Sequence, residues 1–182
     1  MDNDIFNSVL EIEPKDYQMA VFDFDGTLFD TSVCNGLHTF EEKRKLISQY
    51  KMFDDVDAVI KKLKEKGISV AVVSDNSTKT IKDTFKYFGL PTLESKLVKG
   101  WRYPVGNVPK ERLFEEILSE NNLQQNQVIS FGNQQRDIEA SNNCQIDSVA
   151  CKWYWEGTQE ELEGCNAYKT IDNPIQILEF FK

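Results

Sequence analysis

The sequence has only one histidine, His38, and none of its four cysteines stands in a C-x-x-C pair. Reactions that need a histidine base, and metal sites built from several histidines, are therefore poorly supported. We interpret His38 as an ordinary surface side chain. No histidine neighbours the cysteines, which predicts free thiols in a reducing compartment; they are Cys34, Cys144, Cys151 and Cys165.

Long apolar runs and basic patches are missing too. No stretch approaches the roughly 20 apolar residues that span a bilayer, and the first residues do not show the basic start and apolar run of a secretory signal. We therefore expect a cytoplasmic protein without a membrane partner. The chain has 21 Lys and Arg against 30 Asp and Glu, a net charge of -9. This charge disfavours binding to nucleic acid, whereas a small phosphorylated substrate stays compatible if a cation neutralises it locally.

What the sequence does contain is a regular alternation of short apolar strands and amphipathic helices. Such alternation predicts an α/β fold, a parallel sheet with helices on both faces that binds ligands at the carboxyl ends of its strands. A chain of 182 residues suits one core, so we expect a single domain over 17–182 after an N-terminal extension, 1–16, that packs on the surface. Strands are predicted at 21–24, 68–73, 97–98, 128–131, 148–151 and 168–171, and helices at 39–50, 54–66, 78–88, 109–122, 137–143, after Thr158 and after Pro174.

Two acids stand where the first strand ends. Asp23 and Asp25 are two residues apart, so they begin on the same face of an extended chain and can share one site. Two neighbouring carboxylates repel each other unless a proton or a hard cation such as Mg²⁺ lies near them. The pattern indicates a metal site and a nucleophile at this strand end.

The run Asp23-Phe-Asp25-Gly-Thr27 resembles the D-x-D-G-T signature of the haloacid dehalogenase-like hydrolases, a superfamily made up mostly of Mg²⁺-dependent phosphatases. The resemblance implies a three-layer Rossmann-like fold over nearly the whole chain from Tyr17 to Lys182. It also implies an aspartyl-phosphate mechanism, with Asp23 as nucleophile and Asp25 as acid and base. Dehalogenases of this superfamily lack an acid at the position of Asp25, so the chain looks like a phosphatase.

Two further segments are similar to the second and third motifs of the family. Ser74, after an apolar strand and before Asp75 and Asn76, matches the hydroxyl that binds a phosphoryl oxygen; capping of the next helix is its alternative role. Lys110 begins a helix, where a positive charge is unfavourable unless something anionic lies near it. We favour Lys110 over Lys99 as the family lysine. The residues that the resemblance assigns to substrate binding are Ser74, Asp75, Asn76, Gly26, Thr27 and Lys110.

The fourth motif departs from the family. The segment from Gly132 to Asp137 keeps the spacing of G-D-x-x-x-D, but Asn133 replaces the first acid. An amide carbonyl can coordinate Mg²⁺ without supplying a full charge, so we expect a weakened metal site that Asn133→Asp would tighten. The implied cofactor is Mg²⁺, and the implied metal ligands are Asp23, Asp25, Asn133 and Asp137.

Family members often carry a cap domain, for which segments 30–54 and 76–110 are too short here. We expect no full cap and an open site that accepts bulky phosphorylated substrates; aromatic clusters at 101–103 and 153–155 either line it or pack in the core or an interface. Two other functions stay open: a catalytically impaired phosphate-binding or protein-interaction module, which Asn133 motivates, and a phosphotransferase. A homo-oligomer stays open as well.

Overall fold

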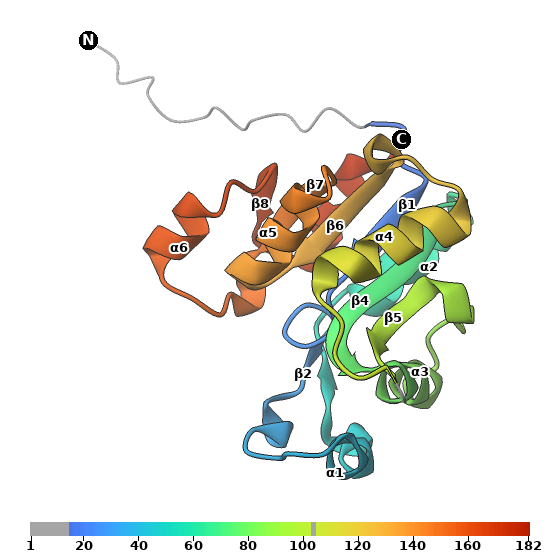
Figure 1. The fold of residues 1–182 in the computed structure, drawn as a ribbon, viewed down its shortest axis with the longest axis vertical. Helices are drawn as coiled ribbons and strands as arrows, with labels where there is room; N and C mark the ends of the chain where they lie inside the picture. The colour runs from blue at the N-terminus through green and yellow to red at the C-terminus, as the bar shows by residue number, and fades with distance from the viewer. Residues whose placement is uncertain (1–14, 103–104) are drawn as a thin grey trace.

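A six-stranded parallel sheet forms the centre of the molecule, in the order β5-β4-β1-β6-β7-β8 (Figure 1). The computed structural model describes residues 15–102 and 105–182, so most of the predicted N-terminal extension and residue Tyr103 of the first aromatic cluster lie outside the described residues. The strands are β1 (Met19–Phe22), β4 (Ser69–Ser77), β5 (Val98–Trp101), β6 (Val128–Gly132), β7 (Asp147–Cys151) and β8 (Lys169–Ile171).

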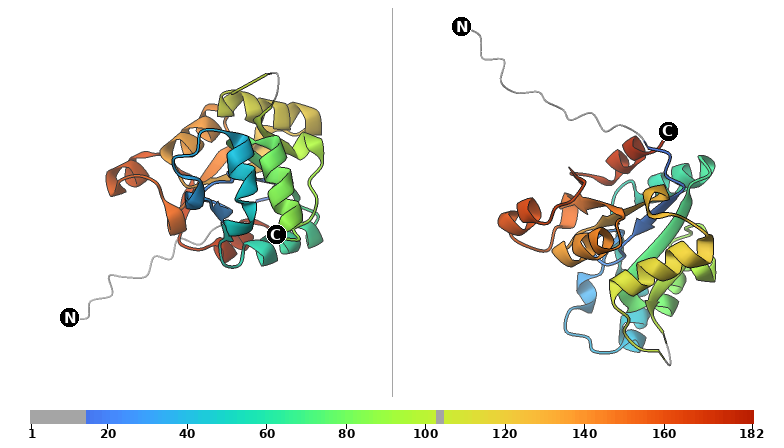
Figure 2. Two further views of the ribbon diagram at one scale, coloured as in Figure 1. Left: turned by 90° about the horizontal axis from the view of Figure 1, so that it is seen from below. Right: turned by 45° about the horizontal axis from the view of Figure 1, so that its top comes forward.

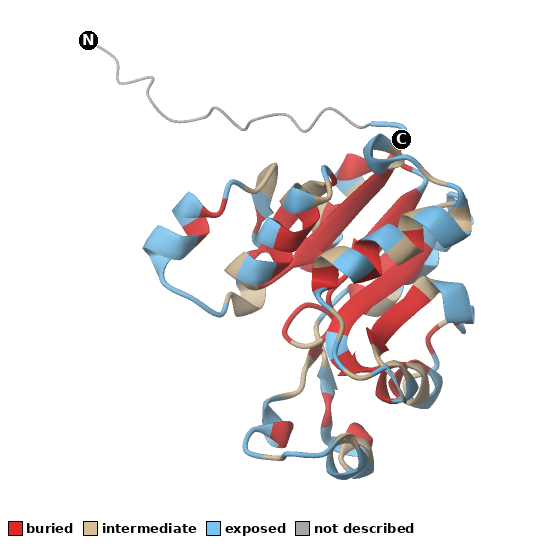
Figure 3. Cartoon of the chain, in the orientation of Figure 1, coloured by how far each residue is buried: buried red, intermediate tan, exposed pale blue. Residues whose placement is uncertain are grey.

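Helices cover both faces of this sheet, because successive side chains of each buried strand point to opposite sides. Ala20 and Phe22 of β1 pack on the side of α2 (Val56–Glu65), α3 (Thr78–Tyr87) and the 3-10 helix η6 (Pro174–Phe180). Met19 and Val21 pack on the side of α4 (Lys110–Asn121) and α5 (Gln135–Asn143). Figure 3 shows the buried strands between helices that are exposed only on their outer sides. The predicted α/β fold is confirmed.

The chain changes direction across the sheet at β1. β1 pairs with β4 on one side and with β6 on the other, in parallel register from Met19 to Phe22. The segments that leave the carboxyl ends of these three strands therefore meet beside one another. In sheets of this kind the crevice at such a switch point is where ligands bind.

A small insertion lies below the carboxyl ends of the strands in the view of Figure 1. It begins with β2 (Phe29–Asp30) and ends with β3 (Lys51–Met52), which pair antiparallel, and it contains η1 (Ser32–Cys34), α1 (Phe40–Lys45) and η2 (Ile47–Gln49). A capping box between Thr39 and Glu42 starts α1. Figure 2 shows this insertion against α3, which Arg44 contacts through an ion pair of 2.8 Å with Asp83. The insertion spans residues 29–52.

Several element boundaries differ from the predicted ones. The helix expected over 39–50 is two short pieces, since the chain turns at Leu46 to bury Ile47 and Tyr50. The last helix, after Asn173, is a 3-10 helix. The strand expected over 68–73 continues to Ser77 with a shift in its pairing to β5. The capping box at Thr158 starts α6 (Gln159–Gly164) as expected. Within the described ranges, none of the helices has the length and apolar character needed to span a lipid bilayer.

Candidate active site

The carboxyl end of β1 places Asp23 at the switch point of the sheet. Asp23 is the first residue after the strand, and its backbone N–H donates to the carbonyl of Phe131 in β6 at 2.9 Å. Lys110 is the first residue of α4, and Asp137 lies in the first turn of α5. The fold therefore brings together three side chains that are up to 114 positions apart in the sequence, from Asp23 to Asp137.

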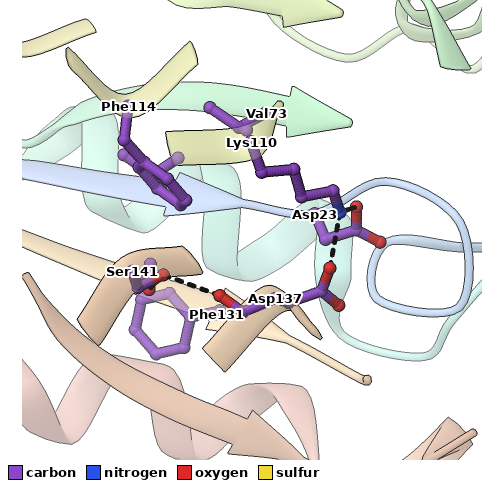
Figure 4. A pocket seen from close by; sticks show the side chains of 9 residues that line it. Asp23, Val73, Lys110, Phe114, Phe131, Asp137 and Ser141 are labelled. Carbon is purple, nitrogen blue, oxygen red and sulfur yellow. Dashed lines mark hydrogen bonds and ion pairs between the residues drawn. The ribbon is translucent and has the colours of Figure 1, made fainter. Parts of the chain in front are cut away.

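Lys110 joins the two acids. Its Nζ donates to Oδ1 of Asp23 at 2.7 Å and to Oδ1 of Asp137 at 2.5 Å (Figure 4). The three side chains are at most 8 % exposed. These acids are the anionic neighbours that a lysine at a helix start requires. The rival candidate, Lys99, instead pairs with Glu120 at 2.6 Å and with Glu116 at 3.7 Å, away from Asp23.

Burial and charge act against each other in this cluster. Burial alone would lower the pKa of Lys110, but the charges of Asp23 and Asp137 outweigh it, so the pKa of Lys110 lies above its usual range. Burial raises the pKa of Asp23, Lys110 opposes this rise, and the charges of Asp137 and Asp25 add to it. When both acids are ionised, one ammonium group faces two carboxylates. A further cation beside these carboxylates would relieve the imbalance.

Asp25 lies outside the lysine-bridged group. Its carboxylate accepts hydrogen bonds from Thr31 Oγ1 at 2.6 Å, from Asn76 Nδ2 at 3.2 and 3.3 Å, and from Ser74 Oγ at 3.4 Å. β1 ends at Phe22, so the alternation of a strand does not determine the direction of the Asp25 side chain. Thr31, Ser74 and Asn76 hold the Asp25 carboxylate in place, and its expected role as a metal ligand stays a prediction.

The side chain of Asn133 lies between the loop of Asp25 and the loop of Tyr154. Its side-chain carbonyl accepts from Thr27 Oγ1 at 3.0 Å, and its NH₂ donates to the carbonyl of Tyr154 at 2.9 Å. The residue is fully buried. Both ends of the amide connect two loops, and the expected role of Asn133 as a metal ligand stays a prediction.

Three residues assigned to substrate binding have other partners in the structure. The backbone N–H of Gly26 donates to the carbonyl of Phe29 at 2.7 Å, and Thr27 is fully buried against Asn133. Asp75 is exposed and forms an ion pair with Arg136 at 3.1 Å. Gly26 and Thr27 therefore shape the loop that carries Asp25. The Thr27 hydroxyl and the Gly26 N–H are used in these internal bonds, and the expected roles of both residues in substrate binding stay predictions.

The carboxylates of Asp23 and Asp137 suit one Mg²⁺ ion that has few protein ligands. In 15–102 and 105–182, no group of three or more His, Cys, Asp or Glu side chains is arranged around a common point for a metal. Asp23 and Asp137 nevertheless lie close together, because both pair with the Nζ atom of Lys110. Mg²⁺ is usually bound by one or two carboxylates together with water and substrate phosphate. Figure 4 shows the second oxygen of Asp23 directed away from Lys110.

Sequence reasoning missed two connections around the site. Thr31 makes the shortest hydrogen bond to Asp25, and no motif marks it. The second aromatic cluster packs against the loop that follows β1 and the start of α2. Trp153 Nε1 donates to the carbonyl of Thr27 at 3.2 Å, and the ring of Tyr154 lies 5.5 Å from that of Phe53. The polar edges of these rings were the available signal, since a buried indole N–H needs an acceptor.

Solved structures with the same fold are hydrolases and phosphatases by their descriptions. A haloacid dehalogenase-like family hydrolase from Streptococcus pneumoniae is 16% identical over 92% of this chain and 99% of its own, with a TM-score of 0.71. A predicted phosphoglycolate phosphatase from Haemophilus somnus is 16% identical over 91% and 98%, with a TM-score of 0.75. A predicted phosphatase from Clostridium acetobutylicum is 18% identical over 90% and 96%, with a TM-score of 0.70. At these identities the likeness shows the fold.

The sequence itself shows the family. No curated protein matches the chain. The family model described as haloacid dehalogenase-like hydrolase matches residues 35–151, well over half of the chain. The match begins after Asp23 and Asp25 and includes Ser74, Lys110 and Asp137. The chain belongs to the haloacid dehalogenase-like hydrolases.

Proposed function

We propose that this protein is a Mg²⁺-dependent phosphomonoester hydrolase that works through an aspartyl-phosphate on Asp23. The observation that carries the proposal is the buried Lys110, which joins Asp23 and Asp137 at the carboxyl edge of the sheet. A nucleophilic carboxylate beside a fixed positive charge suits attack on an anionic phosphoryl group. The phosphatases among the structures of similar fold are consistent with this chemistry.

The first step forms a bond between Asp23 and phosphorus. Oδ2 of Asp23 attacks, since Oδ1 accepts the hydrogen bond from Lys110, and the bond from phosphorus to the leaving-group oxygen breaks. Protonated Asp25 donates its proton to that oxygen, so the leaving group departs as an alcohol. Lys110 keeps Asp23 in position and offsets charge on the phosphoryl oxygens.

The second step restores the enzyme. Asp25, now ionised, takes a proton from a water molecule while the water oxygen attacks phosphorus. The bond between phosphorus and Asp23 breaks, inorganic phosphate leaves, and Asp25 again holds a proton. Thr31, Ser74 and Asn76 keep the Asp25 carboxyl in one orientation through both steps.

Mg²⁺ would be held by Asp23 and Asp137, with water and the substrate phosphate completing its shell. When bound, it neutralises charge on the transferring phosphoryl group and offsets the surplus of carboxylates around Lys110. The replacement at Asn133 leaves these two ligands in place. For that reason we favour an active enzyme over an impaired binding module, while transfer of the phosphoryl group to a second alcohol would use the same residues.

The test is Mg²⁺-dependent release of phosphate from p-nitrophenyl phosphate and a panel of metabolites. Asp23→Asn removes the attacking oxygen charge and should lower kcat by roughly 10³-fold or more, as loss of a nucleophile does. Asp57→Asn is the matched control, because Asp57 is a partly exposed acid that pairs with Lys61 on α2. Chelation with EDTA should also stop turnover. Turnover that survives Asp23→Asn rejects the mechanism, and no turnover of any substrate by the native enzyme rejects the proposed function.

A further inference from the structure

Two buried serines connect β6 to α5 behind the site. The hydroxyl of Ser130, on β6, donates to the hydroxyl of Ser141, on α5, at 2.6 Å. The Ser141 hydroxyl in turn donates to the backbone carbonyl of Asp137, one turn earlier in the same helix, at 2.9 Å (Figure 4). Ser130 is 4 % exposed and Ser141 is fully buried. A chain of two hydrogen bonds therefore runs from the sheet to the helical turn that carries Asp137.

The surroundings of the two serines favour a role for their hydroxyl groups. Burying a hydroxyl costs free energy unless it is hydrogen-bonded, so an apolar pair would fill the same space at lower cost. Ser130 and Ser141 line a small cavity of about 10 Å³ together with apolar side chains that include Val21, Val73 and Phe114. Apolar packing is non-directional, whereas a hydrogen bond fixes a distance and an angle. Where the packing leaves a gap, the two hydrogen bonds give α5 a defined distance from β6.

The Asp137 carboxylate follows the position of this first turn of α5. A Cβ on Gly132, the last residue of β6, would lie 2.4 Å from the Cβ of Asp137, so the turn lies directly against the end of the strand. Oδ2 of Asp137 accepts the backbone N–H of Gln134 at 3.1 Å, and Oδ1 accepts from Lys110. The bond to Gln134 lies at the start of α5 and moves with the helix, whereas Lys110 belongs to α4. A shift of α5 would therefore lengthen the contact between Asp137 and Lys110.

The neighbouring strand makes the same kind of contact without a site residue. Ser148 of β7 pairs in register with Ser130 and is fully buried. Its hydroxyl donates to Oδ1 of Asn142, near the end of α5, at 2.8 Å. Two buried strand serines thus bond to one helix. Only the contact of Ser130 leads to the turn that carries Asp137.

We propose that Ser130 and Ser141 are positioning residues for Asp137. Their hydrogen bonds hold the first turn of α5 at the distance from β6 at which the Asp137 carboxylate meets Lys110 and Mg²⁺. The inference rests on the proposed function for the metal, and it adds two residues that lie outside the four motifs. Both serines act through Asp137 and are not catalytic residues.

The Mg²⁺ requirement of p-nitrophenyl phosphate hydrolysis tests this role. Ser141→Ala removes the bond to the Asp137 carbonyl and retains α5, because alanine has the highest helix propensity. We expect the Mg²⁺ concentration at half-maximal rate to rise about tenfold, since loss of a group that orients a metal ligand lowers metal affinity by about 10- to 100-fold. Ser130→Ala should change it in the same direction by a smaller factor, because the bond from Ser141 to Asp137 remains.

Two further variants separate positioning from general stability. Ser148→Ala is the matched control: it should lower the melting temperature as Ser130→Ala does and leave the Mg²⁺ requirement unchanged. Ser130→Thr keeps the hydroxyl in a residue that suits a strand, and it should retain the native requirement. No change in Ser141→Ala overturns the inference, as does an equal change in Ser130→Ala and Ser148→Ala.

Crystal structures of the native protein and of the Ser141→Ala and Ser148→Ala variants decide the inference without turnover. We expect the contact between Asp137 Oδ1 and Lys110 Nζ, 2.5 Å in the native chain, to lengthen in Ser141→Ala alone. An unchanged contact in Ser141→Ala overturns the positioning role even if the native enzyme hydrolyses phosphomonoesters. A lengthened contact in a protein that hydrolyses none supports the positioning role and rejects the proposed function.

Discussion

Asn133 shows how one residue can keep a motif position and change its role. A carboxylate at this place would supply one acceptor to Thr27 but no donor to Tyr154, whereas the amide supplies both. The amide therefore connects the loop of Asp25 to the loop of the second aromatic cluster. The cost is a lower negative charge near the proposed metal position.

Asn133→Asp is expected to destabilise the protein. An oxygen would replace the NH₂ group 2.9 Å from the Tyr154 carbonyl, so two acceptors would face each other at a fully buried position. Loss of a buried hydrogen bond of this kind costs about 1–3 kcal/mol of unfolding free energy, measured by urea denaturation. Asn35→Asp, at an exposed residue, is the control. Unchanged stability together with tighter Mg²⁺ binding would show that Asn133 faces the ion.

Substitution of Gly26 and of Gly36 by alanine compares a crowded position beside Asn133 with an open one. Both have a positive φ, of 80° and 82°. A Cβ on Gly26 would lie 2.2 Å from Asn133 Nδ2, whereas a Cβ on Gly36 would have nothing within 4 Å. Both substitutions by alanine carry the backbone strain of a positive φ, and only Gly26→Ala adds a steric clash.

We expect Gly26→Ala to lose about 1–3 kcal/mol more stability than Gly36→Ala, the usual cost of overpacking a filled interior. Thermal or urea unfolding of the two variants measures the difference. Equal losses would mean that Asn133 moves away from the new methyl group without cost. In that case the two loops would be connected more loosely than their hydrogen bonds indicate.

At the scale of elements, the start of α3 shows which serine caps this helix. The sequence left two roles open for Ser74, binding of a phosphoryl oxygen and capping of α3. The side chain of Ser77 accepts the backbone N–H of Thr80 at 3.0 Å and caps the helix, and its hydroxyl also lies 2.7 Å from Thr80 Oγ1. Ser74 instead accepts the N–H of Asn76 and contacts Asp25. The strand continues past Ser74, which moves the helix cap three residues onward.

Ser77→Ala should therefore destabilise the fold by about 1–2 kcal/mol, the usual effect of removing a helix cap. The control is Ser119→Ala on the exposed side of α4, where the expected change is within about 0.5 kcal/mol. Urea denaturation compares the two. A Ser77→Ala variant as stable as the native protein would show that water replaces the cap.

The insertion between β2 and β3 is the other element with a consequence for function. Its segments are short, and Ile47 and Tyr50 anchor it in the core with Cys34. Thr31, which follows β2, donates a hydrogen bond of 2.6 Å to the Asp25 carboxylate, so the start of the insertion lies beside Asp25. The open site expected from the absence of a full cap stays a prediction.

For the whole molecule, the free thiols give a direct test of packing. All four cysteines are unpaired, and three of them are buried, Cys144 being half-buried. Burial raises the pKa of Cys144 to about 11, with Glu115 and Glu111 adding to the effect, and burial raises the pKa of Cys151 well above its usual value. Thiolates are the reactive form, so at pH 8 these groups are protonated and inert.

We expect Ellman's reagent to react slowly with the native protein at pH 8 and to detect all four thiols rapidly in urea. A reducing agent should leave the melting temperature unchanged, because no disulfide contributes to stability. Fast reaction of several thiols in the native state would contradict the tight packing around them. A reductant-dependent melting temperature would contradict the absence of a disulfide.

The sequence by itself determined the alternation of strands and helices, and hence the parallel sheet, because hydrophobic periodicity is a local property of the chain. It also placed Asp23 after a strand and Asp137 at a helix start, at the edge where such sheets carry their sites. These features depend on spacing alone. They needed no knowledge of which side chain contacts which.

Only the tertiary structure decided the partners. It brought Lys110 rather than Lys99 to Asp23, turned Asp25 toward Thr31, and enclosed Asn133 between Thr27 and Tyr154. The contact between Thr27 and Asn133 joins residues 106 positions apart. Side-chain direction in loops follows from such long-range hydrogen bonds and from the exclusion of unpaired polar groups, which no local pattern contains.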